Sequence, residues 1–359
     1  MRKAIKLVPD EAEYLSDRGE TYRLMKRYQE ALQDYDCAIE LNSKLDWVIA
    51  QRGQTYRAIE RYQEALQDYD CAIELNPKSD WAIAQRGETY RLMKRYQEAL
   101  QDFDRAIELN PKSDWAIAHR GQTYRLMERY EEALQDFDCA IELNPKSDWA
   151  IAHRGQTYRA MERYQEALQD FDCAIELNPK YDWAIAHRGQ TYRLMERYPE
   201  ALQDFDCAIE LNPKSDWAIA QRGKTYLLMQ RYQEALQDFD IAINLDVNND
   251  WPLYTRALAY QALQQTEKAQ ADLTLSIKLA KQSYEKDAKN WRNTFNLAIY
   301  YLAVEYPKPA EDLYKYALSQ GASLESKWEA IQDLNDFLTI LPNHVQAQSM
   351  RQLLQSSLI

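Results

Sequence analysis

Long apolar runs and catalytic motifs are both missing from this 359-residue sequence. No stretch is aliphatic enough to suggest a segment that crosses a membrane. A nucleophile elbow, a phosphate-binding loop, a zinc-protease motif and a catalytic pair of carboxylates are absent as well. Nearly every polar residue occurs in several copies, so none has the singular placement that catalysis needs. The sequence therefore predicts a chain that is not an enzyme and holds no cofactor.

Positive charge is in short supply. The chain has 44 lysines and arginines against 57 aspartates and glutamates, which gives a net charge of −13 at pH 7. Nucleic acids and anionic membranes attract proteins through an excess of lysine and arginine. We therefore expect neither nucleic acid nor a membrane surface as a partner.

What the sequence has in abundance is one 34-residue segment, repeated. Asp114 to Ser147 reads DWAIAHRGQTYRLMERYEEALQDFDCAIELNPKS, and Asp148 to Tyr181 differs from it at only three positions. A fixed period of this length is typical of repeat proteins, in which each repeat covers an apolar side of its neighbour. Positions are numbered here from the aspartate, 1 to 34. The glycine at position 8 recurs as Gly19, Gly53, Gly87, Gly121, Gly155, Gly189 and Gly223.

The apolar pattern within a repeat predicts two helices. Positions 4, 8, 11 and 14 line one face of a first helix, and positions 17, 20, 21, 24, 27 and 28 form the stripe of a second. Asn144-Pro145 should end the second helix, because proline lacks the N–H that a helix interior needs. Small residues at 8, 20 and 27 would let the paired backbones approach closely, with aromatic rings filling the space around them. The residues are Ile117, Gly121, Tyr124, Met127, Tyr130, Ala133, Leu134, Phe137, Ala140 and Ile141.

Glycine at 8, tyrosine at 11, alanine at 20, phenylalanine or tyrosine at 24, alanine at 27 and proline at 32 resemble the tetratricopeptide repeat family. The resemblance implies an all-α fold, a right-handed superhelical solenoid of antiparallel helix pairs whose first helices line a concave groove. Two features differ from the family pattern, tryptophan at 2 and arginine at 7. The family's groove that clamps a C-terminal carboxylate would need a basic residue at 2 or 5 and asparagine at 9. Tryptophan, alanine and glutamine stand there, so we do not expect that activity.

The repeats divide the chain into regions of different regularity. Residues 4 to 10, AIKLVPD, align with the end of a repeat, which suggests a segment of a longer protein; a short native lead-in is the alternative. The C-terminal helices should cap the stack, because a solenoid needs an atypical element over its last apolar face. The expected regions are 1–11, the tail of a preceding repeat or a lead-in; 12–249, seven regular repeats; 250–283, a degenerate eighth; 284–290, an insertion; 291–324, a ninth; and 325–359, capping helices.

Positions 2, 5, 9 and 12 should face the groove, because they lie opposite the 4, 8, 11 stripe. Tryptophan and arginine dominate binding energy at interfaces. The residues that recur at these positions, called the ladder below, are therefore the candidate site. The alternative is that each tryptophan packs against the adjacent repeat. Arginines at 7 and 16 should instead pair with nearby acids. The candidate residues are Trp81, Trp115, Trp149, Trp183, Trp217, Gln122, Gln156, Gln190, Arg91, Arg125, Arg159 and Arg193.

Histidines and cysteines also recur at fixed positions. His119, His153 and His187 share position 6, but neighbours roughly 10 Å apart cannot share a zinc ion, whose ligands lie about 2 Å away. No metal site is expected. All five cysteines occupy position 26, beyond disulfide reach of one another, and this favours a reduced, cytoplasmic protein. They are Cys37, Cys71, Cys139, Cys173 and Cys207.

These observations favour a binding scaffold that holds a peptide or protein segment in the groove. The segment would carry acidic and aromatic or aliphatic side chains, and the chain would be the recognition arm of a larger protein. A self-association module is an alternative, in which the irregular C-terminal helices or a missing N-terminal repeat pair two arrays. Single-stranded RNA binding, one base per repeat, is a third hypothesis that the acidic exterior disfavours.

Overall fold

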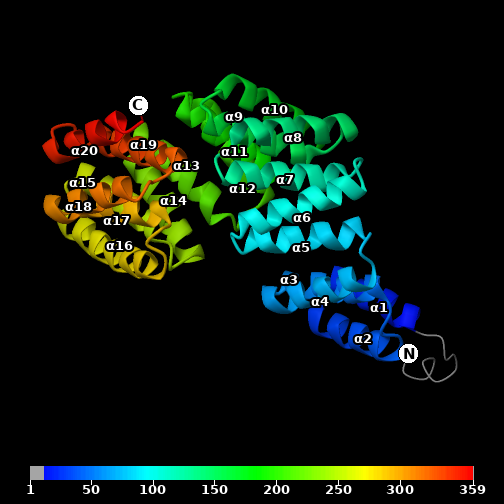
Figure 1. The fold of residues 1–359 in the computed structure, drawn as a ribbon. Helices are drawn as coiled ribbons and strands as arrows, with labels where there is room; N and C mark the ends of the chain where they lie inside the picture. The colour runs from blue at the N-terminus through cyan, green and yellow to red at the C-terminus, as the bar shows by residue number, and fades with distance from the viewer. Residues whose placement is uncertain (1–11, 359) are drawn as a thin grey trace. The chain divides into compact units, whose positions relative to one another are not determined.

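The computed structural model describes residues 12–358, in which every regular element is an α-helix (Figure 1). Consecutive helices pair into repeats, which confirms the expected all-α fold of helix pairs. The pairs are α1 (Ala12–Leu24) and α2 (Tyr28–Leu41), α3 (Asp46–Ala58) and α4 (Tyr62–Leu75), α5 (Asp80–Leu92) and α6 (Tyr96–Leu109), α7 (Asp114–Leu126) and α8 (Tyr130–Leu143), α9 (Asp148–Ala160) and α10 (Tyr164–Leu177), α11 (Asp182–Leu194) and α12 (Tyr198–Leu211), α13 (Asp216–Leu228) and α14 (Tyr232–Leu245), α15 (Asp250–Ala262) and α16 (Thr266–Lys286), α17 (Trp291–Ala303) and α18 (Pro307–Ser319), and α19 (Leu324–Ile340) and α20 (Val345–Ser356).

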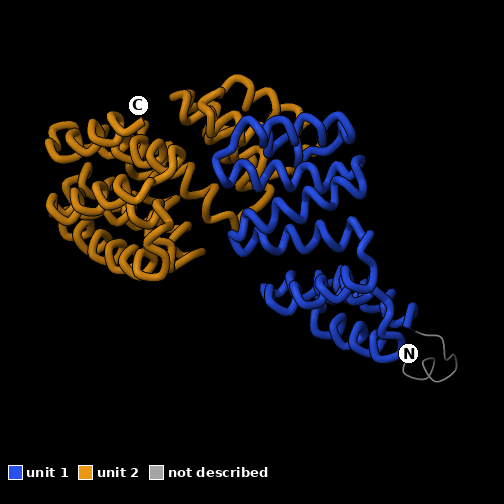
Figure 2. Tube along the Cα trace, in the orientation of Figure 1, with its two compact units in different colours: residues 1–154 blue, residues 155–359 orange. Residues whose placement is uncertain are grey.

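Two compact units divide the chain, an N-terminal unit of residues 1–154 and a C-terminal unit of residues 155–359 (Figure 2). The boundary falls inside α9, after its first two turns. Each unit is described by itself below. None of the helices among residues 12–358 has the length and apolar character that a membrane crossing requires.

Local signals set the ends of the helices. From repeat 2 to repeat 8 the first helix starts with an aspartate, and in repeat 4 (residues 114–147) the Ser113 hydroxyl accepts a hydrogen bond from the Ala116 N–H at 3.3 Å. Such a cap satisfies an N–H that has no partner inside the helix. At its other end the chain turns through Glu128, which has a φ of +59°. This turn lets the Arg129 N–H donate to the Tyr124 carbonyl at 2.9 Å, as in a Schellman motif.

The two helices of a repeat meet at glycine and alanine. Phe137, Ala133 and Ala140 are at most 1% exposed. A Cβ atom added to Gly121 would lie 3.0 Å from the Asp136 Cβ and 3.2 Å from the Ala133 carbonyl oxygen. These distances are shorter than ordinary van der Waals contact between such atoms. The expected close approach of the helices at position 8 is therefore confirmed.

The burial pattern differs from the expected stripe in several places. Tyr124 and Met127, at positions 11 and 14, are only half-buried, and the Arg129 guanidinium covers the Tyr124 ring at 4.4 Å. Ala116 and Thr123, at positions 3 and 10, are fully buried although the stripe excluded them. The physical reason is that a first helix contacts neighbouring repeats as well as its own partner, as α7 contacts α6 and α5. More than one of its faces is therefore covered.

An aspartate at position 23, absent from our expected core, lies buried between the helices. Arg120, at position 7, donates to both carboxylate oxygens of Asp136 at 2.8 and 2.7 Å, and to Asp104 of the preceding repeat at 2.7 Å. Burial raises the pKa of Asp136, and the hydrogen bonds from Arg120 offset part of that rise. We call this arrangement the arginine clasp. The same contacts are made by Arg52, Arg86, Arg188, Arg222 and Arg256.

The arginine at position 16 pairs with a nearby acidic residue, as expected. Arg129 donates to Glu132, three residues further on, at 2.9 and 2.7 Å. Both side chains are 41% exposed, so this pair contributes well under about 1 kcal/mol. The pairing that we expected for arginines at 7 and 16 is confirmed.

The C-terminal region is more helical than its sequence suggested. The first part of the expected insertion, residues 284–286, continues α16 without a break, and only 287–290 connects it to α17. Helix α20 contacts α17 and α18, whereas α19 contacts α15 and α17. The buried side of α19 includes Ile331, Leu334 and Phe337, each at most 1% exposed, in the same apolar cluster as α15 to α18. The proposed repeat tail or lead-in at 1–11 lies outside the described residues.

Candidate functional site

Position 2 of each regular repeat after the first places an indole at the start of a first helix. In the N-terminal unit Trp47, Trp81 and Trp115 are 39, 38 and 37% exposed. Trp149 in the same unit, and Trp183 and Trp217 in the C-terminal unit, are half-buried. The indoles are neither sealed inside the array nor fully free, so each ring has both a packed side and an open side.

Imidazoles separate neighbouring indoles where position 6 is histidine. In the N-terminal unit the His119 ring lies 4.0 Å from Trp115 and 4.6 Å from Trp149, centroid to centroid. In the C-terminal unit His187 lies 4.0 Å from Trp183 and 4.8 Å from Trp217. The contacts of His119 with Trp149 and of His187 with Trp217 join consecutive repeats, so these two indoles pack against a neighbouring repeat on one side.

Hydrogen bonds fix the orientation of the His119 ring. Its Nδ1 lies 3.1 Å from Glu88 Oε2, and Arg91 donates to both oxygens of the same carboxylate at 2.7 Å. Burial acts to raise the pKa of Glu88, but the bonds from His119 and Arg91 outweigh it and bring the pKa down to about 2. Burial also lowers the pKa of His119. Burial thus disfavours the charged form of the imidazole, and the neighbouring Glu88 carboxylate opposes this effect in part.

The arginines at position 12 are far less available than the sequence suggested. Arg125 and Arg193 are each only 7% exposed. Arg91 is held by Glu88 of its own helix, and Arg159 donates to Gln190, the position 9 residue of the next repeat. These guanidinium groups are therefore buried or paired within the protein, and that of Arg159 reaches the next first helix.

The glutamines at position 9 are half-buried and serve the same contacts. Gln190 accepts from Arg159 and also lies 3.3 Å from Nδ1 of His187. The Oε1 atom of Gln122 is buried without a hydrogen-bond partner among the described residues. Gln156 is half-buried as well. Of the residue types in the expected ladder, tryptophan is thus the one that reaches the surface most consistently.

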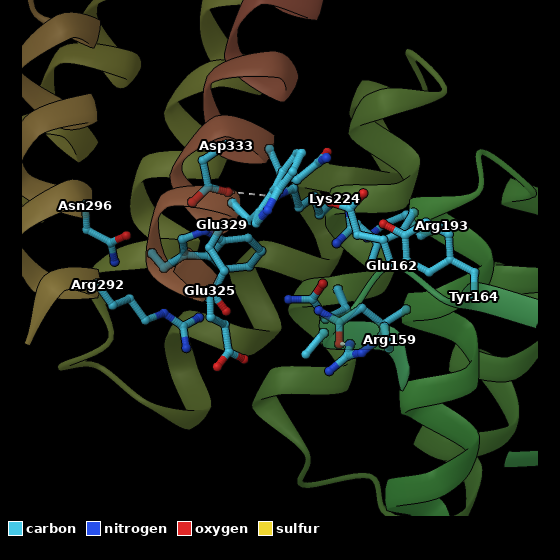
Figure 3. Close-up of a pocket in the computed structure, with 17 residues that line it drawn as sticks. Arg159, Glu162, Tyr164, Arg193, Lys224, Arg292, Asn296, Glu325, Glu329 and Asp333 are labelled. Carbon is cyan, nitrogen blue, oxygen red and sulfur yellow. Dashed lines mark hydrogen bonds and ion pairs between the residues drawn. The ribbon is translucent and has the colours of Figure 1, made fainter. Parts of the chain in front are cut away.

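A second feature is a pocket in the C-terminal unit, with a volume of about 150 Å³, shown in Figure 3. The first helices of four repeats supply one part of its lining, including Arg159, Gln190 and Lys224. Helix α17 supplies Arg292 and Asn296, Glu162 and Tyr164 come from the turn before α10 and its first residue, and a further wall comes from α19. The lining residues of α19 are Glu325, Trp328, Glu329, Gln332 and Asp333.

Ion pairs tie α19 to the first helices at this pocket. The Lys224 Nζ lies 3.1 Å from Asp333 Oδ1 and 2.6 Å from Asp336 Oδ2, and Arg193 Nη1 lies 3.9 Å from the same Asp336 oxygen. Lys224 is 6% exposed. Part of α19 therefore lies against the first helices and forms a wall of the pocket.

Charge in the pocket is mixed. The Glu329 carboxylate opens to the hollow, but the protein atoms around it exclude much of the bulk water, and this raises its pKa; Arg292 lowers it in part. Burial likewise raises the pKa of Glu162. Both carboxylates would gain from an N–H donor on a ligand. No group of three potential metal-ligating side chains converges among residues 12–358.

Our sequence reasoning missed this pocket, although two signals were present. Lys224 replaces the glutamine or glutamate that occupies position 9 in the preceding repeats. Glu325, Glu329, Asp333 and Asp336 are spaced so that they share one face of a helix. An acidic helix face and an isolated lysine in the ladder together indicate a contact between the two.

Comparisons with known proteins agree with this architecture. The tetratricopeptide repeat family matches residues 12–45, 48–79, 81–113, 115–147, 149–181 and 183–215, and a further tetratricopeptide repeat description matches 252–283. No curated protein matches the chain.

Solved structures include similar folds. A tetratricopeptide repeat protein from Parabacteroides merdae ATCC 43184 is 22% identical, with a TM-score of 0.57 over 69% of this chain and 98% of that one. Pseudomonas aeruginosa pilF is 18% identical, with a TM-score of 0.51 over 56% of this chain and 91% of that one. At these identities the likeness concerns the fold alone. The family matches and the paired helices together show that the chain belongs to the tetratricopeptide repeat family.

Proposed function

We propose that this protein is a non-catalytic scaffold that binds a peptide or protein segment along its first helices. Tetratricopeptide repeats generally serve as protein-binding scaffolds. The observation that carries the proposal is the repeated indole: Trp47, Trp81 and Trp115 are 37–39% exposed at equivalent positions. Exposed tryptophans are unusual on a surface without partners, and their large flat rings supply much of the energy at interfaces.

The chemistry of the partner follows from the two features of the site. Aromatic or aliphatic side chains would pack on the indoles of the ladder. A carboxylate of the partner would pair with Arg292, which is exposed at the pocket of the C-terminal unit. Charge-assisted bonds from arginine to carboxylate are among the stronger polar contacts. The candidate arginines at position 12 would not contact the partner, but would hold neighbouring first helices in register.

The setting of the protein is part of the same proposal. All five cysteines are exposed free thiols, a state that persists in a reducing compartment. This supports a cytoplasmic protein. The repeats would serve as the recognition arm of a larger assembly, whose activity resides elsewhere.

A selection of displayed random peptides against the intact protein tests the proposal. We expect enriched peptides that bind the protein and lose at least about tenfold in affinity to the Trp81→Ala, Trp115→Ala double variant, because two partly exposed rings are removed. Because Trp115 also packs against Phe103 and His119, circular dichroism would verify that the helices remain in the double variant.

A matched control distinguishes binding by the ladder from non-specific hydrophobic binding. Leu75 and Leu109 are 45 and 41% exposed at the ends of second helices. The Leu75→Ala, Leu109→Ala variant should bind the enriched peptides as the unaltered protein does. If the tryptophan variant binds the peptides as tightly as the unaltered protein, the indoles are not the binding surface. The same conclusion follows if the leucine variant loses as much affinity as the tryptophan variant.

A further inference from the structure

The pocket that α19 forms with the first helices of the C-terminal unit, called the α19 pocket below, has most of its positive charge already engaged (Figure 3). The Lys224 Nζ pairs with Asp333 and Asp336 at 3.1 and 2.6 Å. Arg193 is buried, with Nη1 3.9 Å from the same Asp336 carboxylate. Arg159 donates to a glutamine of the next repeat. These three basic side chains are therefore used within the protein.

Two carboxylates of the α19 pocket are in the opposite situation. Glu329, on α19, and Glu162, in the turn before α10, line the hollow from different elements. Neither carboxylate forms a hydrogen bond or an ion pair with any residue from 12 to 358. An ionised carboxylate only accepts hydrogen bonds, and protein atoms around Glu329 displace much of the water that would donate to it. A ligand with N–H donors would supply the missing bonds.

The balance of charge favours a cation as that ligand. Four basic and four acidic residues line the α19 pocket. Asp336 lies just outside it and pairs with Lys224 and Arg193, so the acids exceed the bases by one. A ligand with a single positive charge balances the site. A carboxylate placed against Glu329 would be repelled, and an apolar side chain would cover the Glu329 carboxylate without giving it a partner.

Aromatic rings line the same hollow and indicate a flat cation. Trp328 precedes Glu329 on α19 and is 37% exposed. Its ring makes no stacking or cation–π contact within the part of the chain that the structure describes. Cations lie favourably over tryptophan rings, and arginine does so more often than lysine. A guanidinium can lie flat on an indole while its edge donates to a carboxylate, because its N–H groups share one plane.

The size of the α19 pocket agrees with a guanidinium. Its volume is about 150 Å³, and a cavity of roughly 150 Å³ is large enough to hold a benzene molecule. A guanidinium group with two methylene groups has as many heavy atoms as benzene. The end of an arginine side chain therefore fits inside, and its backbone would remain outside, as in a residue of a longer peptide.

From these observations we propose that the α19 pocket binds an arginine side chain of the protein's partner. The guanidinium lies on the Trp328 ring and donates hydrogen bonds to Glu329, and Glu162 adds negative charge from another wall. Lysine is a poorer occupant, because its ammonium group is compact and strongly hydrated. This inference rests on the proposed function and adds an arginine to a partner whose carboxylate pairs with Arg292.

An NMR titration of the full chain, with its tryptophan indoles isotopically labelled, tests the inference. The Trp328→Leu variant identifies the Trp328 indole signal by its absence. A blocked pentapeptide with arginine between glycines should shift that signal saturably, with a dissociation constant of about 1 mM or below. The same peptide with citrulline, an uncharged analogue of arginine, should bind at least about tenfold more weakly. A lysine peptide should bind at least about threefold more weakly.

Variants of the protein identify the surface. Glu329→Gln keeps the size of the side chain but removes its charge, and should weaken the arginine peptide at least about tenfold. Glu210→Gln is the matched control, because it removes an exposed charge from α12 of the same unit, outside the α19 pocket. It should leave binding unchanged. Trp328→Leu, followed through the Trp251 indole signal, should weaken binding about threefold because the cation–π contact is lost.

The outcomes separate the inference from the proposed function, which is tested on the indoles of the N-terminal unit. If the arginine peptide does not shift the Trp328 signal, or the citrulline or lysine peptide binds equally well, the arginine assignment is wrong and the scaffold stands on its own test. If Glu210→Gln weakens binding as much as Glu329→Gln, overall charge and not the α19 pocket attracts the peptide. If free arginine binds at least about tenfold more tightly than the peptide, the pocket recognises the amino acid and its assignment to a partner is wrong.

Discussion

Glycine at position 8 offers a sharp test of how the paired helices fit, because the chain contains its own comparison. In repeat 7 a Cβ added to Gly223 would lie 2.9 Å from Cε1 of Phe239. Repeat 8 has Ala257 at the equivalent position, and there Leu273 takes the place of the facing aromatic residue. Both Ala257 and Leu273 are fully buried. The pair glycine with phenylalanine thus becomes alanine with leucine.

The magnitude follows from the contacts. Carbon atoms pack best at about 3.5 to 4.0 Å, so the Gly223→Ala methyl group would overlap the Phe239 ring and force a shift that costs about 1 to 3 kcal/mol. Alanine is better than glycine inside a helix by roughly 0.5 to 1 kcal/mol. We expect a net loss of about 1 to 2 kcal/mol. When Phe239 is replaced by leucine, the Gly223→Ala substitution should be well tolerated. The two substitutions should then show a favourable coupling free energy of at least about 0.5 kcal/mol.

Stability in a solenoid is local, so the assay should be local as well. Native-state hydrogen exchange of α13 and α14, read by mass spectrometry, would give the opening free energy of repeat 7 in the two single variants and the double variant. Additive effects of Gly223→Ala and Phe239→Leu would refute the reasoning. An unaltered opening free energy in Gly223→Ala would refute it too.

Two further predictions concern charge in the N-terminal unit. The pKa of Glu88 is about 2 against an ordinary value of 4.5, so up to about 3 kcal/mol of stability, present above pH 4.5, should be lost as the pH falls towards 2. The lowered pKa of His119 adds a loss that begins as the pH falls below about 6.5. Urea unfolding at a series of pH values would measure both losses. The Glu88→Gln variant should lose less stability than the unaltered protein between pH 4.5 and pH 2. An equal loss in the variant would contradict the role given to Glu88. Replacing Arg120 by lysine keeps the charge but loses the two-pronged contact with Asp136, and should lower stability by about 1 to 2 kcal/mol. Arg129→Lys, in an exposed pair, should be within about 0.5 kcal/mol of neutral in the same urea assay.

The sequence predicted the fold well because repetition makes its signals redundant. Position 8 is glycine in seven repeats and position 32 is proline in most, so the helix pairs could be placed from the period alone. The arginine clasp was less accessible to this reasoning. A buried Asp136 looks like any other acid on a helix until its distance to Arg120 is known.

The candidate site was only partly predictable, for a related reason. Periodicity placed tryptophan and arginine on the same side of the first helix, but it cannot tell a guanidinium that reaches solvent from one that turns towards the next repeat. Trp115 and Arg125 illustrate the difference, at 37 and 7% exposed. The pocket depends on α19, whose path follows from tertiary contacts that no repeat pattern encodes. Self-association remains a prediction, which light scattering over a range of concentrations would test.

The arginine clasp has a consequence for the history of the gene. Each clasp joins an arginine to one aspartate of its own repeat and one of the repeat before it. A repeat that is duplicated or deleted whole therefore leaves a junction chemically equal to the one it replaces. Unequal crossing-over between near-identical copies, such as 114–147 and 148–181, can lengthen or shorten the protein in steps of one repeat while every remaining joint stays matched.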